Sequence, residues 1–335
     1  EPGMLGQMFL QAKNHINTPA RLSGLIDMIG RETWSGLNSD LKGNIYEELL
    51  AKTAEDKKSG AGQYFTARAL ISVIMSCVRP QPGETICDPA CGTGGFFLKA
   101  YEYILENYAD KMNVQEKRFL KNDTFFGNEI VATTRRLCLM NMYLHNMGSL
   151  DGAVPVELKD ALVSSPSKLV KIVTTNPPFG KKTAQTVIND EGEESKEKQL
   201  YNRQDFWCET SNKQLNFLQV IYRSLKADGK ARCAVVLPDN VLFAAGDGAS
   251  VRRELMNFCN LHTVLRLPTG IFYAQGVKTN VLFFTRGKTE KGNTKEVVFY
   301  DMRTNMDSFG KTRQLRRDDF AEFIEGYKDP AKRTG

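Results

Sequence analysis

The spacing of apolar and polar residues changes near residue 84. Before it, stretches such as RLSGLIDMIG, DLKGNIYEELLAK and ARALISVIMSCV repeat their apolar residues at helical spacing, which predicts amphipathic helices. After it, short apolar runs alternate with helical patterns, which predicts a mostly parallel sheet with helices on both faces and a hairpin near the end. The runs are ETICD, DTFFGNE, KLVKIVTTN, KARCAVVLP, LHTVLRLP, TNVLFFTRG and EVVFYD.

Residues 181–198 interrupt this alternation. Their sequence, KKTAQTVINDEGEESKEK, combines both signs of charge with few apolar residues. Segments of this composition bury too little apolar surface to fold alone, so we predict a solvated, mobile loop. Because the segment follows directly on the sequence NPPF, a loop that becomes ordered over a substrate is the alternative.

The overall composition is that of an ordinary globular protein. The chain has 335 residues, 41% hydrophobic and 25% charged, which is enough for one large domain with an appendage or for two domains. Its formal net charge of +6 permits a polyanionic partner without requiring one. The seven cysteines and three histidines are scattered without a CxxC pair, which indicates neither a disulfide framework nor a metal site and favours a reducing cytoplasm. No apolar run approaches the roughly 18 residues needed to span a bilayer, so we expect no membrane partner.

The stretch ETICDPACGTGGFFLKAYEYIL carries the strongest signal for chemistry. A short strand is predicted to end at Asp88, and a helix is predicted to begin near Phe96. The turn between them contains Gly92, Gly94 and Gly95. Glycines allow backbone N–H groups and a ligand to approach closely at the N-terminus of a helix. The arrangement therefore predicts a site for a nucleotide-like cofactor.

The kind of cofactor follows from what the turn lacks. It does not have the GxGxxG pattern typical of dinucleotide sites, and the chain contains no GxxxxGK[ST] motif for phosphates. A carboxylate at the strand end, that of Asp88, is unsuited to phosphate but suits the ammonium group of S-adenosylmethionine. Glu129 ends the next predicted strand in FFGNEI, where ribose hydroxyls need an acceptor, as in dinucleotide sites. The alternative is a structural turn with a solvated Glu129.

A second turn follows the apolar run KLVKIV. In the sequence TTNPPFGKK, Pro177 and Pro178 lack a backbone N–H group and hold the chain extended, so a strand has to stop at Asn176. One interpretation is a rigid turn without further function. The other is that the turn presents the Asn176 amide, the Pro177 carbonyl and the Phe179 ring at the carboxyl edge of a sheet, where open α/β folds bind ligands. The four residues NPPF alone leave both interpretations open.

The two turns together resemble the amino-methyltransferase family that acts on adenine N6 in DNA. GAGQYFTAR at residues 60–68 resembles the additional cofactor-binding motif that this family often places ahead of the glycine-rich turn. The resemblance is strongest to modification (M) subunits of type I restriction–modification systems, through SDLKGNIYEELLAK, LPDNVLF and LPTGIFYAQGVKTNVLFF, and it spans about residues 38–310. Ala67 stands where the family usually has proline, which slightly loosens the expected turn.

The resemblance implies a fold and a set of site residues. The fold is α/β, the doubly wound class I S-adenosylmethionine-dependent methyltransferase fold with a helical N-terminal segment. That segment would be residues 1–59, the catalytic domain residues 60–310, and a C-terminal tail residues 311–335. The implied catalytic residues are Asn176, Pro177, Pro178 and Phe179. The implied cofactor-binding residues are Gln63, Tyr64, Phe65, Thr66, Ala67, Arg68, Asp88, Ala90, Gly92, Thr93, Gly94, Gly95, Glu129 and Asp160, and no metal ligand is among them.

Adenine methylation gives Asn176 a defined task. The exocyclic amine of adenine is a poor nucleophile because its lone pair is delocalised into the ring. If the Asn176 side-chain oxygen and the Pro177 carbonyl accept its N–H groups, they favour a pyramidal nitrogen that can attack the methyl group of S-adenosylmethionine. The absence of a Pro-Cys dipeptide argues against the cytosine-C5 reaction, which needs a thiolate. Phe179 would stack on a base that has left the duplex.

Five further residues are candidates, each with a structural alternative. Asp160 is expected either to contact the cofactor's adenine or to be a plain surface residue. Phe272 and Tyr273 would form the second wall of the base pocket or pack in the core. Lys181 and Lys182 would hold DNA phosphates or remain solvated.

The resemblance also implies partners. These are double-stranded DNA, a specificity (S) subunit and a restriction (R) subunit, with two copies of this chain per S subunit in the cytoplasm. About 25 residues follow the predicted catalytic domain, too few for a DNA-reading domain, so sequence specificity is expected from the S subunit. Two rival functions are a methyltransferase of the same fold acting on a protein amide or another nucleobase, and a non-catalytic DNA-binding scaffold. The intact turns at Asp88 and Asn176 argue against the scaffold.

Overall fold

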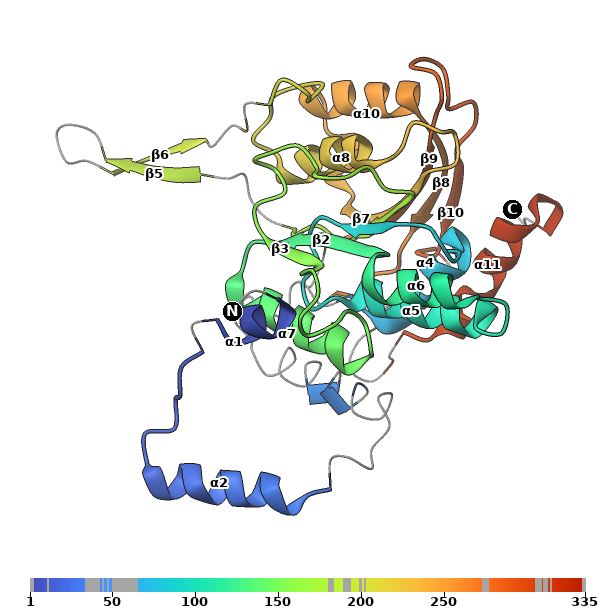
Figure 1. Ribbon diagram of the computed structural model, residues 1–335. Helices are drawn as coiled ribbons and strands as arrows, with labels where there is room; N and C mark the ends of the chain where they lie inside the picture. Colours follow the sequence, from blue (N-terminus) through green and yellow to red (C-terminus); the bar gives the residue numbers. More distant parts are fainter. Residues whose placement is uncertain are drawn as a thin grey trace.

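An eight-stranded sheet runs through the body of the protein, in the order β10-β8-β9-β7-β4-β1-β2-β3 (Figure 1). β1 is parallel to its neighbours β2 and β4, whereas β9 is antiparallel to its neighbours β7 and β8. The mostly parallel sheet and the antiparallel pairing near its end confirm the prediction. The strands are β1 (Ile86–Asp88), β2 (Phe125–Glu129), β3 (Val156–Leu158), β4 (Ile172–Thr175), β7 (Arg232–Pro238), β8 (Cys259–Arg266), β9 (Thr279–Arg286) and β10 (Val298–Asp301).

The structure is a computed structural model that describes most of the chain. The described residues are 3–10, 12–33, 43, 45, 46, 48, 49, 66–179, 184–188, 194–198, 201, 203–272, 277–304, 309, 313 and 315–332. For residues 184–188 and 194–198 the description covers the backbone.

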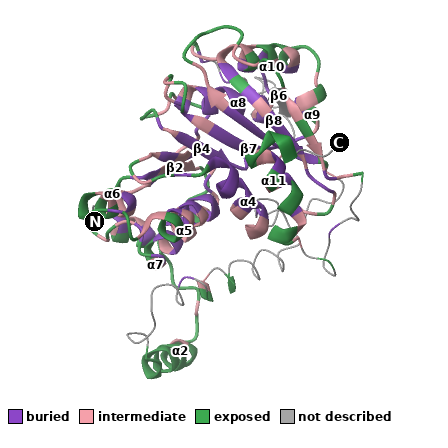
Figure 2. Cartoon of the chain, turned by 90° about the vertical axis from the view of Figure 1, so that its right-hand side faces the viewer, coloured by how far each residue is buried: buried purple, intermediate pink, exposed green. Residues whose placement is uncertain are grey.

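Helices cover both faces of the sheet (Figure 1). One face carries α4 (Arg68–Val78), α5 (Gly95–Tyr108), α6 (Val114–Asn122), α7 (Ala132–Leu144) and α11 (Ala321–Lys328). The other carries α8 (Lys213–Ser224), α9 (Asn240–Phe243) and α10 (Asp247–Phe258). Each face buries its own apolar cluster, and Figure 2 shows the buried residues gathered on the central strands and the helices beside them. Strands buried on both faces have to be apolar on both sides, which is why they are short continuous apolar runs in the sequence.

The N-terminal helices differ in how they contact the body. α1 (Met4–Phe9) packs on α7 and on the chain that follows it. The Arg135 guanidinium of α7 donates to Gln7 Oε1 at 2.9 Å, and the Leu5 N–H donates to the Leu150 carbonyl, beyond the end of α7, at 3.1 Å. α2 (Pro19–Arg31) has no buried residue and lies apart from the sheet (Figure 1). The helices predicted in RLSGLIDMIG and ARALISVIMSCV are confirmed as α2 and α4. The stretch DLKGNIYEELLAK lies largely outside the described residues.

Two parts of the predicted pattern were wrong. Within the segment predicted as a loop, β5 (Ala184–Ile188) and β6 (Glu194–Lys198) pair as an antiparallel hairpin that projects from the body (Figure 1). The intervening sequence NDEGE contains Asn, Asp and Gly, residue types that favour turns, and hairpin pairing uses backbone groups whatever the side-chain composition. The edge strand β3 was not predicted, because three residues are too few to produce a recognisable alternation.

The segment expected to be a C-terminal tail contains α11. Phe323 of this helix is 2% exposed, and its ring centre lies 6.1 Å from that of Phe283 in β9 and 5.3 Å from that of Tyr300 in β10. The helix therefore covers the outer strands of the sheet on the α4 side. In the part of the chain that the structure describes, no helix combines the length and the apolar character that crossing a membrane requires.

Candidate active site

A cavity of about 600 Å³ lies beyond the carboxyl ends of β1, β2 and β4. The chain leaves β1 toward β2 on one side and continues through β4 toward β7 on the other, and ligands of open α/β sheets bind where the strand order reverses in this way. Most of the predicted site residues that are described line the cavity: Thr66, Arg68, Asp88, Ala90, Gly92, Thr93, Gly95, Glu129, Asp160, Asn176 and Pro178.

The glycine-rich turn forms the floor of the cavity between β1 and α5. Gly94 caps α5 in the left-handed conformation with φ 84°, which glycine adopts without strain. A Cβ atom at Gly94 would lie 2.8 Å from the sulfur of Cys138 in α7, closer than real side-chain contacts allow. The turn is therefore packed against α7 on one side and open to the cavity on the other.

Asp88, at the end of β1, is a buried carboxylic acid. The residue is 1% exposed, and its Oδ1 accepts the backbone N–H of Ala90 at 2.9 Å. Burial disfavours the charged form and raises the pKa of Asp88 to about 7. A cation that enters the cavity would stabilise the ionised form of this buried carboxylate and lower its pKa.

Glu129, at the end of β2, bonds to the glycine-rich turn. Its Oε2 accepts the backbone N–H of Gly92 at 3.0 Å, and its Oε1 accepts that of Val131 at 2.8 Å. Burial raises the pKa of Glu129, while these hydrogen bonds favour the charged form. The same carboxylate thus fixes the turn and lies in the wall of the cavity.

Asn176 follows the last residue of β4 and is 8% exposed. Its Nδ2 donates to the hydroxyl oxygen of Thr66 at 2.9 Å. Its Oδ1 is buried and has no hydrogen-bond partner among the described residues. Leaving a buried acceptor unpaired costs about 1–3 kcal/mol, so the arrangement indicates an acceptor kept for a ligand.

The rest of the NPPF turn is held by its neighbours. Gln214 of α8 donates to the Pro178 carbonyl at 3.1 Å. The Phe179 ring packs edge-on against Phe272, with ring centres 5.5 Å apart and planes at 80°. Phe272 is 5% exposed within the main apolar cluster, which favours core packing over the pocket-wall alternative. Pro177 is buried beside Asn176 in the chain, and neither it nor Phe179 lines the cavity.

Three predicted cofactor residues differ from the others: one also has a structural role, and two do not line the cavity. Asp160 lines the cavity, but its carboxylate is also structural, since it accepts the Leu162 N–H at 2.9 Å and the Tyr201 hydroxyl at 3.1 Å. Ala67 precedes α4 as its N-cap, and like Gly94 it does not line the cavity. Outside the described residues lie Gln63, Tyr64, Phe65, Lys181, Lys182 and Tyr273. Their roles, like those of the lining residues, stay predictions.

Sequence reasoning missed three residues that shape the glycine-rich turn. A Cβ atom at Gly127 in β2 would overlap the side chain of Cys91. The Asn128 carbonyl accepts the Cys91 N–H at 3.0 Å, and Asn141 of α7 donates from its side chain to the Thr93 carbonyl at 2.9 Å. A glycine inside a strand is a signal of close backbone approach and could have identified Gly127. Nothing in the sequence marks Asn141.

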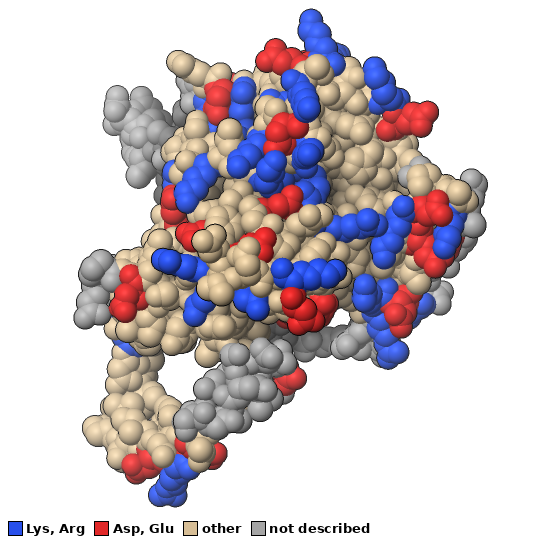
Figure 3. Space-filling model, turned by 45° about the vertical axis from the view of Figure 1, so that its right-hand side comes forward, with Lys and Arg blue, Asp and Glu red and all other residues tan. Residues whose placement is uncertain are grey.

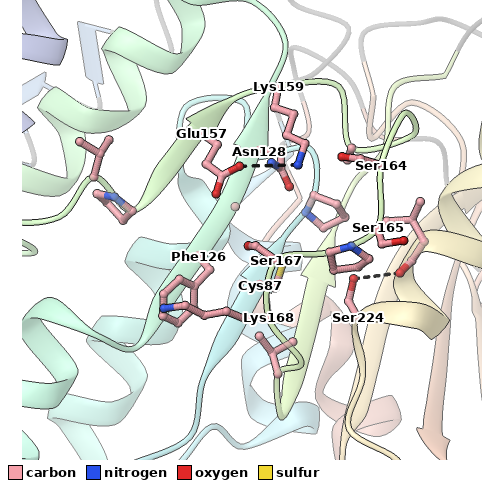
Figure 4. A pocket seen from close by; sticks show the side chains of 18 of the residues that line it. Cys87, Phe126, Asn128, Glu157, Lys159, Ser164, Ser165, Ser167, Lys168 and Ser224 are labelled. Atoms are coloured by element: carbon pink, nitrogen blue, oxygen red, sulfur yellow. Dashed lines mark hydrogen bonds and ion pairs between the residues drawn. The ribbon is translucent and has the colours of Figure 1, made fainter.

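A smaller cavity of about 160 Å³ adjoins the first one on the α8 side of β2 (Figure 4). Its two lysines both have partners. Lys159 Nζ lies 3.9 Å from a carboxylate oxygen of Glu157, and Lys168 Nζ lies 3.8 Å from the centre of the Phe126 ring. No described residue of the predicted site lines this cavity. The larger cavity is therefore the candidate active site.

Comparison with known proteins places the chain in a family. Residues 37–334 match the family described as N-6 DNA methylase. The chain belongs to this family. It is 42% identical over 345 residues to the methylase subunit of the type I restriction enzyme StySJI from Salmonella typhimurium, an alignment that covers 98% of this chain and 62% of that protein. The predicted resemblance to type I M subunits is confirmed by this similarity.

Solved structures of this methylase family have the same fold. The crystal structure of the M protein of the type I restriction enzyme EcoKI (EC 2.1.1.72) matches with a TM-score of 0.69 and 40% identity, over 86% of this chain and 58% of that one. A chain from a structure of a type I restriction–modification system matches with a TM-score of 0.78 and 30% identity. This match covers 98% of the present chain and 64% of the other one. The predicted class I methyltransferase fold is confirmed. This chain spans about three fifths of these relatives, so the short segment after its last strand carries no argument about specificity.

Proposed function

We propose that this protein transfers a methyl group from S-adenosylmethionine to N6 of adenine in double-stranded DNA, as the modification subunit of a type I restriction–modification system. The observation that carries the proposal is the unpaired Oδ1 of Asn176, in the wall of the cavity that also contains Asp88 and Glu129. Membership of the N-6 DNA methylase family supports it.

The residues around the cavity fit S-adenosylmethionine. The cofactor supplies a methyl group that its sulfonium centre makes electrophilic. Asp88 offers a buried carboxylate to the ammonium group, and Glu129 offers an acceptor to the ribose hydroxyls. The glycine-rich turn allows close approach to the N-terminus of α5. The cavity of about 600 Å³ lies within the range typical of small-molecule sites.

The catalytic contribution of the chain is positional and electrostatic. Asn176 Oδ1 and the Pro177 carbonyl accept the two N–H groups of the adenine amine and favour its pyramidal form, which exposes the lone pair for attack. Because the nitrogen itself attacks, the chain needs no nucleophile of its own. Phe179, whose ring packs edge-on against Phe272 and does not line the cavity, is the residue assigned to stack on the base.

The charge of the surface bears on how DNA is bound. Figure 3 shows a face on which Lys and Arg side chains are interspersed with Asp and Glu. Ion pairs such as Lys171–Asp228 and Arg232–Glu84 neutralise part of the positive charge. With a net charge of +6, we expect the protein alone to bind DNA weakly, with strong salt dependence and little sequence preference.

Specificity in this proposal comes from a partner. The names of the relatives describe subunits of type I restriction enzymes, and by analogy a specificity subunit reads the DNA sequence for two copies of this protein, while a restriction subunit joins the complex. The complex acts in the cytoplasm. We assign residues 60–310 to the catalytic domain, between an N-terminal segment of residues 1–59 and residues 311–335, whose helix α11 packs on the same sheet.

The test of the proposed function separates it from its rivals. The full-length protein is incubated with methyl-labelled S-adenosylmethionine and DNA, with and without its specificity subunit, and the labelled product is identified by mass spectrometry. We expect N6-methyladenine at one sequence only when the specificity subunit is present. Labelled protein would favour the methyltransferase that acts on a protein amide. Cofactor binding without any methyl transfer would favour the non-catalytic scaffold. Complete methylation of one DNA sequence in the absence of the specificity subunit would contradict the proposal that this subunit supplies the specificity.

The pKa of Asp88 predicts how cofactor binding depends on pH. Binding of an ammonium group lowers this pKa below its value of about 7 in the empty site, so binding below pH 7 has to release a proton. The affinity for S-adenosylmethionine should fall roughly tenfold for each pH unit below about 7. Titration calorimetry in buffers of different ionisation enthalpy measures both the affinity and the released proton. Asp88→Asn should bind weakly and show no such slope, whereas a flat profile in the unaltered protein would contradict the role of Asp88.

Glu129 predicts a graded effect on the same affinity. Glu129→Ala removes the acceptors of two backbone N–H groups and should weaken cofactor binding by about 1–3 kcal/mol, and Glu129→Gln, which keeps one acceptor, should weaken it less. The matched control is Glu116→Ala, since Glu116 also accepts a backbone N–H, from Asn113 at 2.9 Å, but outside the cavity. Equal cofactor affinity in the Glu129→Ala and Glu116→Ala proteins would contradict the assignment.

A further inference from the structure

The hydroxyl of Thr66 forms a hydrogen bond with a residue that is distant in the sequence. Thr66 lies two residues before the start of α4 at Arg68, one position ahead of the N-cap Ala67, and no side chain caps this helix. The hydroxyl oxygen accepts instead from Asn176, 110 positions away in the chain. Both residues are buried, at 6% and 8% exposure. The bond thus ties the start of α4 to the turn after β4.

This bond matters because an asparagine amide has two different ends. Oδ1 accepts and Nδ2 donates, and only Oδ1 can pair with an amine that donates its N–H groups. When Oδ1 accepts from a ligand, the buried Nδ2 needs a separate hydrogen-bond acceptor in the cavity wall. Thr66 Oγ1 at 2.9 Å is the acceptor that the structure provides. Without it, the orientation that serves the amine would leave a buried donor unpaired.

We infer that Thr66 is a positioning residue for methyl transfer: its hydroxyl holds the Asn176 amide with Oδ1 available to the adenine amine. The inference rests on the proposed function. Thr66 acts through Asn176 and touches neither reacting atom. The resemblance assigned Thr66 to cofactor binding alone, and this role is separate from that one.

The variants Thr66→Val and Thr66→Ser separate the hydroxyl from the shape of the side chain. Valine replaces threonine at nearly equal volume without an acceptor, and serine keeps the acceptor. We expect Thr66→Val to lower the single-turnover rate of methyl transfer about ten- to a hundredfold, with the Kd for S-adenosylmethionine unchanged. Thr66→Ser should restore most of the rate. The matched control is Thr279→Val, which removes a buried hydroxyl from β9 away from the cavity.

A double variant tests whether Thr66 acts through Asn176. In an Asn176→Ala background the amide is gone, so Thr66→Val should lower the rate no further. A readout without catalysis uses protein labelled with ¹⁵N-asparagine, in which the side-chain amide protons of Asn176 should exchange with solvent faster after Thr66→Val. The inference would be overturned if the two substitutions lowered the rate of methyl transfer additively. It would also be overturned if Thr66→Val changed neither that rate nor the exchange of the Asn176 amide protons. Methylation by the unaltered protein would leave the proposed function standing in both cases. Loss of cofactor affinity in Thr66→Val would favour the cofactor role instead, and absence of methylation in the unaltered protein would contradict both.

Discussion

Replacing Asn176 by alanine should lower the rate of adenine methylation by about 10²–10³-fold, the effect of removing one preorganised acceptor or donor from a site of charge development. The loss should appear in the single-turnover rate, because in the proposed reaction Oδ1 pairs with an amine whose charge changes during methyl transfer. Binding of S-adenosylmethionine should survive, since the carboxylates of Asp88 and Glu129 are unaltered. Single-turnover transfer of a labelled methyl group and calorimetry measure the two quantities separately.

A matched control for Asn176→Ala is Asn293→Ala. The Asn293 amide donates to the carbonyls of Asn257 and Thr289, far from the cavity in the connection between β9 and β10. Its loss should change the melting temperature without a selective effect on methyl transfer. A near-normal rate in Asn176→Ala, or an equal loss of rate in both variants, would show that the amide has no special part in the reaction.

Gly94→Asp should abolish measurable binding of S-adenosylmethionine. A side chain at this position is strained by the backbone φ of 84° and would press on Cys138, so the turn has to move from its place between β1 and α5. The aspartate also adds a negative charge to the glycine-rich turn, next to Cys138 of α7. We expect the Kd to rise by at least about a hundredfold, given that close backbone approach and local charge both change. Calorimetry on protein that is still folded by circular dichroism checks this expectation.

Gly83→Asp is the matched control for Gly94→Asp. Gly83 also has a positive φ, 82°, but no atom lies within 4 Å of an added Cβ, and the residue is exposed before β1. The backbone strain is therefore similar, whereas the cavity is untouched. If folded Gly94→Asp protein bound the cofactor as tightly as Gly83→Asp, the glycine-rich turn would not be the cofactor site.

The ends of the central strands were predictable because their signals are local. Pro177 and Pro178 stop a strand in any surroundings, and β4 ends at Thr175 as predicted. Gly92, Gly94 and Gly95 marked a turn, and the φ angles of Gly92 and Gly94 are positive, as glycine allows. Because parallel strands end at one edge of a sheet, correct strand ends were enough to bring Asp88, Glu129 and Asn176 to a common cavity.

Contacts between distant segments were not predictable from these local signals. Thr66 and Asn141 bond to site residues through side chains whose direction depends on how α4 and α7 pack, and one sequence carries no record of that packing. The contact of Phe179 with Phe272 likewise depends on the path of the chain after β8. The β5–β6 hairpin was not predictable from composition, because its strands have the mixed charge and low apolar content that are typical of loops.

The burial of Asp88 also affects how the stability of the unliganded protein depends on pH. Its pKa is about 7 when folded and about 4 in an unfolded chain, so between these values the folded state binds the extra proton, and stability falls as the pH rises from about 4 to 7. At neutral pH the protein thus carries a destabilising charge in its interior. A bound cation relieves this cost. In the proposed function that cation is the ammonium group of S-adenosylmethionine, so cofactor binding should also raise the melting temperature of the protein.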